Sequence, residues 1–114
     1  MIYRNLGNTG MRVGVVSLGC GGFEGMDGPG IRRLIHYAME RGVNFIDMFT
    51  ADPGIRSAVG EALAGKRERM RLQGHIGSAW VNGQYLCTRD PALTRAAFED
   101  QLERLSTEYL DIGM

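Results

Sequence analysis

Short apolar runs alternate with segments of helical spacing along nearly the whole chain, and this alternation limits the fold more than any other feature. The runs at 13–19, 43–48, 70–75 and 109–114 predict strands. The first is nearly all apolar, as in a strand covered on both faces, whereas polar Arg71 and Gln73 interrupt the third. Between the strands, apolar residues recur at spacings of three and four. This order indicates right-handed βαβ units and a parallel sheet.

Three helices are predicted between these strands. The first begins near Pro29 and ends at Gly42, the second ends at Gly65, and the third has Asp90 as its N-cap and Pro91 at its first position. The residues expected on the buried sides are Ile31, Leu34, Ile35, Ala38 and Met39, then Ile55, Val59, Ala62 and Leu63, and finally Phe98, Leu102 and Leu105.

The N-terminal residues predict a β-hairpin. Residues 2–6 and 11–15 are apolar-rich and flank the turn cluster at 7–10. The segment 76–89 is predicted to be a long loop. We therefore expect one domain over 1–114, with a hairpin at 1–15 and three βα units plus a terminal fourth strand at 13–114. A complete eight-stranded α/β barrel needs roughly 250 residues, so these 114 residues cannot form one.

A four-stranded parallel sheet of this kind has two unpaired edges. If all three helices cover one side, the other side carries Val16, Leu18, Phe45 or Ile46, Leu72 and Ile112. An apolar face of that size marks an interface. The sequence therefore predicts that the chain self-associates, with a homo-oligomer as its expected state.

Charge and composition narrow the choice of partners. The 114 residues hold 13 Lys+Arg and 13 Asp+Glu, so the net charge is zero and neither nucleic acid nor a membrane surface is an expected partner. Cys20 and Cys87 lie far apart without metal-ligand spacing, so no metal site is predicted and a reducing compartment is favoured. The N-terminus lacks the apolar core of a signal peptide, which places the expected location in the cytoplasm.

The loop after the first strand offers an alternative class of function. Gly19, Gly21 and Gly25 form a glycine-rich pattern, and Asp47 ends the next strand, where a small Rossmann-like module would hold the ribose of a dinucleotide. Such a site needs the glycines at the helix N-terminus. Residues 26–30 lie between these glycines and the predicted helix, so a flexible loop without a nucleotide is the simpler interpretation.

Four segments together carry a family resemblance. They are YRNLGNTGMRVGVVSLGCGGF, RGVNFIDMF, VGEALAGKRE and LERLSTEYLDIGM, and they resemble, in order, the N-terminal half of aldo-keto reductases. The resemblance implies half of a (β/α)₈ TIM barrel closed at its base by a hairpin. It also implies NADPH-dependent reduction of carbonyls by an oxidoreductase with Asp, Tyr, Lys and His at the carboxyl ends of the strands.

The resemblance transfers poorly at the level of single residues. Asp47 stands at the family's aspartate, Asp52 stands where the family has its tyrosine, and His75 stands where it has its lysine. The family's histidine and most of its NADPH-binding loops would follow Met114. No residue of this chain is therefore assigned to cofactor binding.

The segment QGHIGSAWVNGQYLCTRD resembles a branch of the family with histidine in place of the lysine. Full-length members of that branch carry iron–sulfur cysteines near the C-terminus. These 114 residues contain no such cysteine cluster, and no cluster is predicted in them.

Asp47 and His75 are the candidate catalytic residues. Both end neighbouring predicted strands, where a carboxylate could orient and charge the imidazole as a general acid or base. The alternative is an inherited polar pair without a cofactor to serve. Of the remaining candidates, Tyr85 could replace the missing proton donor or pack on the barrel mouth, and Trp80 could be a binding anchor or an interface contact.

Two further groups of side chains are expected to lie in solvent. They are His36, on the first helix, and the basic cluster Lys66, Arg67, Arg69 and Arg71 at the start of the third strand, for which contact with a phosphate is the alternative.

Three functional hypotheses remain open. The first is an oligomeric half barrel without carbonyl reductase activity of its own. The second is an oxidoreductase whose NADPH-dependent site is rebuilt in an oligomer. In the third, the chain is the N-terminal piece of a longer product whose missing half completes the site.

Overall fold

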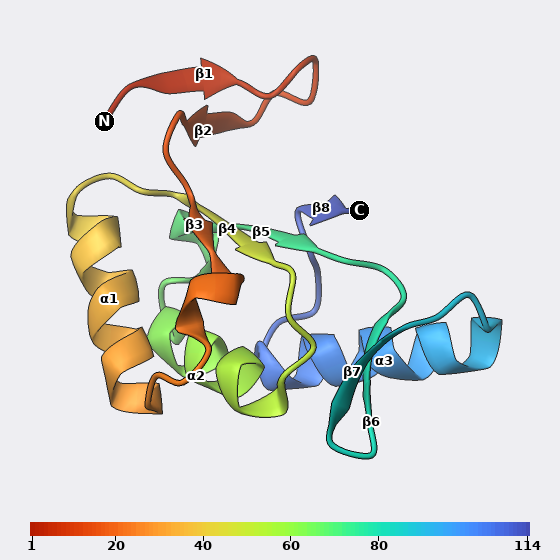
Figure 1. Ribbon diagram of the computed structural model, residues 1–114. Coiled ribbons are helices and arrows are strands. Elements are labelled where there is room, and N and C mark those ends of the chain that lie inside the picture. Colours follow the sequence, from red (N-terminus) through yellow and green to blue (C-terminus); the bar gives the residue numbers. More distant parts are fainter.

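The fold is half of an α/β barrel, as predicted. The computed structural model describes all 114 residues. Four parallel strands, β3 (Leu18–Gly19), β4 (Phe45–Met48), β5 (Arg71–Gly74) and β8 (Ile112–Gly113), form a sheet in the order β3-β4-β5-β8. The helices α1 (Gly28–Glu40), α2 (Pro53–Leu63) and α3 (Pro91–Arg104) lie together on one side of this sheet, which does not close on itself (Figure 1).

Each helix begins at an aspartate followed closely by a proline. The side chains of Asp27, Asp52 and Asp90 accept hydrogen bonds from the third backbone amide beyond them, at 2.7, 2.9 and 2.7 Å. These caps satisfy amides that lack a partner inside the helix. The predicted cap at Asp90 is confirmed, whereas the cap of α2 by Asp52 was not predicted.

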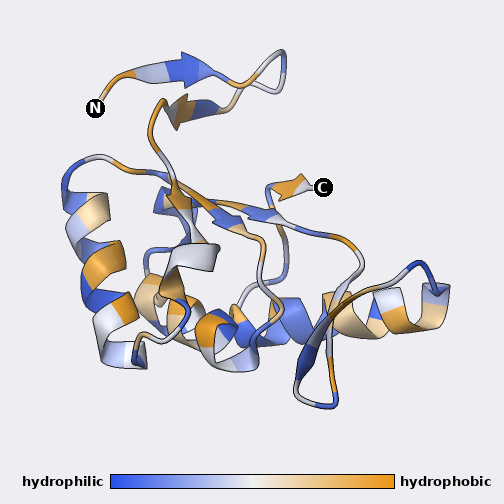
Figure 2. Cartoon of the chain, in the orientation of Figure 1, coloured by the Kyte–Doolittle hydropathy of each residue, from blue (hydrophilic) through white to orange (hydrophobic).

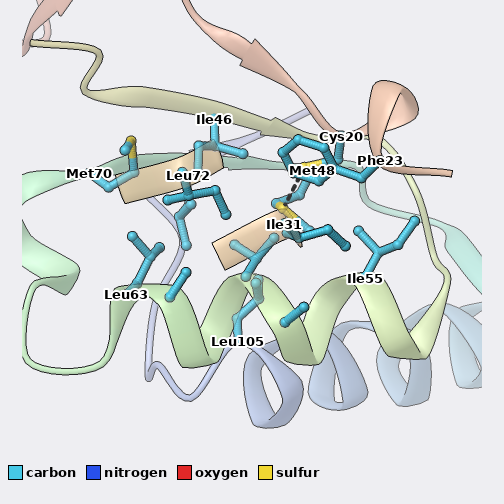
Figure 3. Close-up of a cluster of buried hydrophobic side chains, with 14 of the residues drawn as sticks. Cys20, Phe23, Ile31, Ile46, Met48, Ile55, Leu63, Met70, Leu72 and Leu105 are labelled. Atoms are coloured by element: carbon cyan, nitrogen blue, oxygen red, sulfur yellow. Dashed lines mark hydrogen bonds between the residues drawn. The ribbon is translucent and has the colours of Figure 1, made fainter. Parts of the chain in front are cut away.

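The core lies between the sheet and the helices. Figure 3 shows its side chains filling the space between the sheet and α2. Cys20 and Phe23, in the short 3₁₀ helix η1 (Cys20–Phe23), are buried there, and the Cys20 thiol lies 3.1 Å from the Met48 sulfur. Most of the expected core residues of α1 and α2 belong to this cluster, including Ile31, Ile35, Met39, Ile55, Val59, Ala62 and Leu63. Leu34, also expected there, is exposed instead.

The buried side of α3 differs from the prediction. Leu105 is buried as expected, but Phe98 and Leu102 are only half-buried, and Ala97 and Gln101 occupy the buried side. The reason is close approach: a β-carbon added at Gly74 of β5 would press on the Gln101 side chain, and one added at Gly60 of α2 would collide with the backbone at the end of α3. Small or flexible side chains suit such a contact better than Phe98.

The prediction of an apolar open sheet face is wrong in part. Ile46 and Leu72 are aligned neighbours in the sheet and are completely buried beneath the helices. Asp47 and Gln73 are the next aligned pair and therefore project from the opposite face. Figure 2 shows the corresponding hydrophilic positions within β4 and β5.

The other residues expected on the open face differ in where they lie. Leu18 packs against the core, and Val16 lies in the exposed segment before β3. Phe45 and Ile112 are the half-buried apolar residues of the open face. A short run of mostly apolar residues in the sequence does not show which of them face the helices, and this explains the wrong assignment of Ile46 and Leu72.

The segment predicted to be a long loop contains a second hairpin. Strands β6 (Ser78–Val81) and β7 (Gln84–Cys87) pair antiparallel around Asn82 and Gly83. Both turn residues have positive φ, 52° and 78°. This is the backbone that an Asn-Gly turn supplies to a two-residue hairpin.

The first hairpin is present as predicted. Strands β1 (Tyr3–Asn5) and β2 (Arg12–Gly14) pair antiparallel. The Asn44 side chain ties this hairpin to the segment before β4, since its Oδ1 accepts from the Gly14 amide at 2.8 Å and its Nδ2 donates to the Arg12 carbonyl at 2.9 Å.

Part of the basic cluster before β5 is not simply solvated. Arg67, in the 3₁₀ helix η2 (Arg67–Arg69), and Arg71 form ion pairs with Asp111 at 2.9 and 3.0 Å. Asp111 also accepts a hydrogen bond from the Leu72 amide. These contacts join Asp111, the residue before β8, to β5 and to the segment that precedes it.

None of the helices has the length and hydropathy that a membrane crossing requires.

Candidate functional site

Asp47 and His75 meet at the carboxyl ends of the strands. Asp47 lies on β4 and His75 directly follows β5, and His75 Nε2 is 2.9 Å from Asp47 Oδ1. The two side chains keep 35% and 21% of their surface exposed. The contact predicted from the sequence is thus present, at the end of the sheet where barrels carry their chemistry.

The hydrogen bond defines what each nitrogen of His75 can do. Because the carboxylate accepts, Nε2 carries the proton of this contact, and Nδ1 is the nitrogen that Asp47 does not engage. Gln73 Nε2 donates to the same Asp47 oxygen at 3.1 Å. An imidazole protonated on both nitrogens keeps its Nε2–H on the carboxylate and has a second N–H at Nδ1 to donate.

Gln73 and Phe49 are site residues that sequence reasoning missed. From the sequence Gln73 is only a polar interruption of its strand, whereas its alignment with Asp47 places it on the same face. The Phe49 ring meets the His75 ring edge to face at 5.5 Å. A polar residue on the strand that neighbours the one carrying Asp47 was the available signal for Gln73.

Of the other candidates, only Tyr85 comes near the pair, since its ring stacks on the Phe49 ring with centroids 5.6 Å apart. Asp52, at the position of the family's tyrosine, caps α2 through the Ile55 amide. His36 is not a purely solvated residue, since its Nε2 lies 2.8 Å from the Ala62 carbonyl and links α1 to α2. Trp80 is partly exposed on β6, and Tyr85 on β7 forms a hydrogen bond with Ser78 at 3.2 Å.

The fold excludes the Rossmann-like alternative. A dinucleotide fold has helices on both faces of its sheet and binds where the strand order reverses. Here the order β3-β4-β5-β8 follows the chain, and the helices share one face. The glycine-rich loop contributes Cys20 and Phe23 to the core instead.

The helix N-termini of this chain do not fit nucleotide phosphates. A phosphate at such a terminus takes the place of a cap and accepts hydrogen bonds from the first amides. In α1, α2 and α3 an aspartate carboxylate already accepts from one of those amides and adds negative charge. These three helix N-termini are therefore not free to bind a phosphate, and no group of three His, Cys, Asp or Glu side chains is placed to bind a metal ion.

Known structures share this fold. No family model matches the sequence. A Pseudomonas aeruginosa protein assigned to the aldo-keto reductases is 30% identical, with a TM-score of 0.85 over 99% of this chain and 45% of its own. A Bacillus halodurans aldo-keto reductase in its holo form is 28% identical, with a TM-score of 0.86 over 99% of this chain and 39% of its own.

A third relative was solved with a nucleotide. It is an aldo-keto reductase from Klebsiella pneumoniae in complex with NADP and acetate, 25% identical, with a TM-score of 0.67 over 90% of this chain and 35% of its own. The chain spans less than half the length of each of these three proteins.

Proposed function

We propose that this chain, which is folded as part of an aldo-keto reductase barrel, is a self-associating half barrel that carries a proton-transfer pair and reduces no carbonyl on its own. The observation that carries the proposal is the 2.9 Å contact between Asp47 and His75 on an open sheet. Reduction of a carbonyl needs a proton at its oxygen and a hydride at its carbon. Asp47 and His75 supply the means for the first of these.

The proton step follows from the geometry of the pair. Asp47 engages Nε2 of His75, so the proton on Nδ1 of the charged imidazole is the one that passes to a carbonyl oxygen. As the proton leaves, the imidazole becomes neutral and Asp47 keeps the same hydrogen bond. Gln73 fixes the carboxylate that orients the ring.

The hydride donor has no evident place in this chain. NADPH is the expected donor because of the family resemblance and the NADP complex of the Klebsiella protein. The capped helix N-termini speak against a phosphate site formed by these residues alone. We therefore expect no turnover from the isolated half barrel.

Self-association is supported by the edges of the sheet. β3 pairs only with β4 and β8 pairs only with β5, so each has an unpaired side. Exposed apolar residues lie next to both edges, with Val15 and Val16 before β3 and Met114 after β8. Unpaired strand edges beside apolar surface favour pairing with another chain.

The second candidate is an oxidoreductase whose site is completed by a second copy or by additional polypeptide. The intact Asp47–His75 contact favours it, because an ordered pair at the strand ends is ready for use once a nucleotide site is present. We place either form in the cytoplasm on account of the free cysteines Cys20 and Cys87.

Three measurements on the purified chain separate the candidates. Light scattering is expected to give at least twice 12.6 kDa, while NADPH fluorescence titration and a carbonyl reduction assay are expected to show neither saturable binding nor turnover. A molar mass of one chain at all concentrations refutes self-association. Turnover that is lost in His75→Ala and kept in the control His36→Ala refutes inactivity and establishes the second candidate.

A further inference from the structure

α3 carries apolar side chains on two faces, and only one of these faces is fully buried. The helix is the last of its layer, with α2 on one side only (Figure 1). Ala97 and Gln101 belong to the buried face, whereas Phe98 and Leu102 lie on a second face and are half-buried. This second face borders a groove, which we call the α3 groove. The residues that line it include Ile76, Thr94, Arg95, Phe98, Glu99 and Leu102.

The α3 groove adjoins the end of the sheet. The Ile76 amide donates to the Met114 carbonyl at 2.7 Å, and a β-carbon added at Gly113 of β8 would lie 3.6 Å from the Ile76 side chain. Ile76 and Met114 are 47% and 67% exposed. β8 is also a strand with one unpaired side. The groove therefore extends the apolar surface beside this sheet edge onto the helix layer.

Two exposed charges of opposite sign lie along the α3 groove. Arg95 and Glu99 are four residues apart, so they share one side of the helix. Neither takes part in any of the ion pairs within the chain. Both charges are therefore available to a partner that presents an acidic and a basic side chain at the same spacing.

A second copy of α3 presents that arrangement. If two α3 helices cross antiparallel at Phe98, the levels of Arg95 in one copy and Glu99 in the other differ by two residues, which is about 3 Å along the axis. The same two-fold axis sets Glu99 beside Arg95 in return, so the ion pair forms twice. Thr94 then lies at the level of Leu102 of the other copy. A parallel crossing sets Arg95 level with Arg95 and gains no such contact.

We propose that the α3 groove is the surface through which two copies of this chain associate, with α3 packed antiparallel against the α3 of the second copy. Phe98 and Leu102 form the apolar centre of the contact, and the two ion pairs between Arg95 and Glu99 flank it. This inference rests on the proposed function, since it takes self-association as given. It adds the face, the orientation and the residues of the contact.

Charge reversal tests this orientation without disturbing the core. Arg95→Glu and Glu99→Arg each set like charges against one another at both contacts. Each is expected to weaken the dimer about tenfold in sedimentation equilibrium of the full chain. Arg33→Glu is the matched control, because Arg33 is exposed on α1 and does not line the groove, and it is expected to leave the dissociation constant unchanged. Circular dichroism establishes that each variant is folded.

A mixture of the two reversed variants gives a readout that a structural defect cannot imitate. In a mixed dimer, the acidic side chain introduced at 95 meets the basic side chain introduced at 99, and the native Arg95 and Glu99 meet as well. We expect native mass spectrometry of an equimolar mixture to show the mixed dimer in excess over both single-variant dimers. A mixed dimer in statistical proportion overturns the inference.

The result is separable from the fate of the proposed function. An oligomer that responds to neither reversal keeps the self-association and overturns the α3 groove as its surface. A wild-type chain that is monomeric at all concentrations refutes the self-association and, with it, a second copy as the occupant of the groove. Weakening by each reversal with recovery in the mixture supports the inference whether or not the chain reduces a carbonyl.

Discussion

The buried guanidinium of Arg56 is the connection on which the packing of the second hairpin and α3 depends. The residue is 1% exposed and donates to the carbonyls of Thr50, Ala97 and Ser78 at 3.2, 3.5 and 3.3 Å. It also pairs with Asp100 at 3.3 Å. Burial lowers the pKa of Arg56 from its ordinary value, and the nearby Asp100 carboxylate opposes that shift.

The expected cost of Arg56→Ala follows from these partners. Each of the three carbonyls loses a charged donor in a region closed to water, at about 1 kcal/mol apiece. The lost side chain leaves unfilled space between α2 and α3, which adds to the cost. We expect the free energy of unfolding to fall by about 3–5 kcal/mol, a large share of the 5–15 kcal/mol typical of a domain.

Urea denaturation with linear extrapolation measures this change. Arg104→Ala is the matched control, because Arg104 also pairs with Asp100, at 2.7 Å, but both of those side chains are 37% exposed. An exposed pair of this kind contributes less than about 1 kcal/mol. If Arg56→Ala costs no more than Arg104→Ala, the buried arginine does not hold the hairpin and α3 in place and the reasoning fails.

Three other perturbations test the packing and the titratable groups. Gly60→Ala is expected to lower the free energy of unfolding by about 1–3 kcal/mol in urea denaturation, because the new β-carbon meets the backbone at the end of α3. This cost exceeds the gain from alanine's better helix propensity. Gly22→Ala is the control, since the space around Gly22 is open and little change is expected. Burial alone would raise the pKa of Asp111, but the Leu72 amide and the Arg67 guanidinium hold it below its ordinary value of 3.8. Stability from the charged form is therefore present above that value and is lost as pH falls through the lower folded-state pKa, so the advantage of the wild type over Asp111→Asn is expected to shrink in acid melts; a constant difference contradicts this. Burial raises the pKa of the Cys20 thiol to about 12, so a thiol reagent is expected to modify exposed Cys87 first and Cys20 only on unfolding; equal rates contradict the burial of Cys20.

The elements of the fold were predictable where local chemistry determines them. Proline beside Asp90, glycine at the helix ends and apolar spacing all act within a few residues, and the corresponding helices and strands are present. The second hairpin was predictable in the same way from Asn82 and Gly83, a pair that favours the turn they form. Treating that segment as a loop ignored an available local signal.

Which side chains face the helices could not be predicted in the same way. Ile46 and Asp47 are neighbours in a short, mostly apolar run, and only the alignment of β4 with β5 shows that Ile46 is buried and Asp47 open. The prediction that Phe98 is buried is wrong for a related reason, since the closeness of α3 to Gly74 is a property of tertiary packing. The Asp47–His75 contact was predictable because both residues end adjacent parallel strands. The contact of the Phe49 ring with His75 was not, because it depends on the tertiary structure.

The attachment of the first hairpin has a consequence for how the molecule opens. The hydrophobic cluster includes no residue from 1–15. The ribbon formed by β1 and β2 is joined to the body chiefly by polar contacts, among them the two hydrogen bonds of Asn44. It is therefore a separable cooperative unit: its amides should exchange with solvent through a local excursion that leaves the helices and the sheet intact.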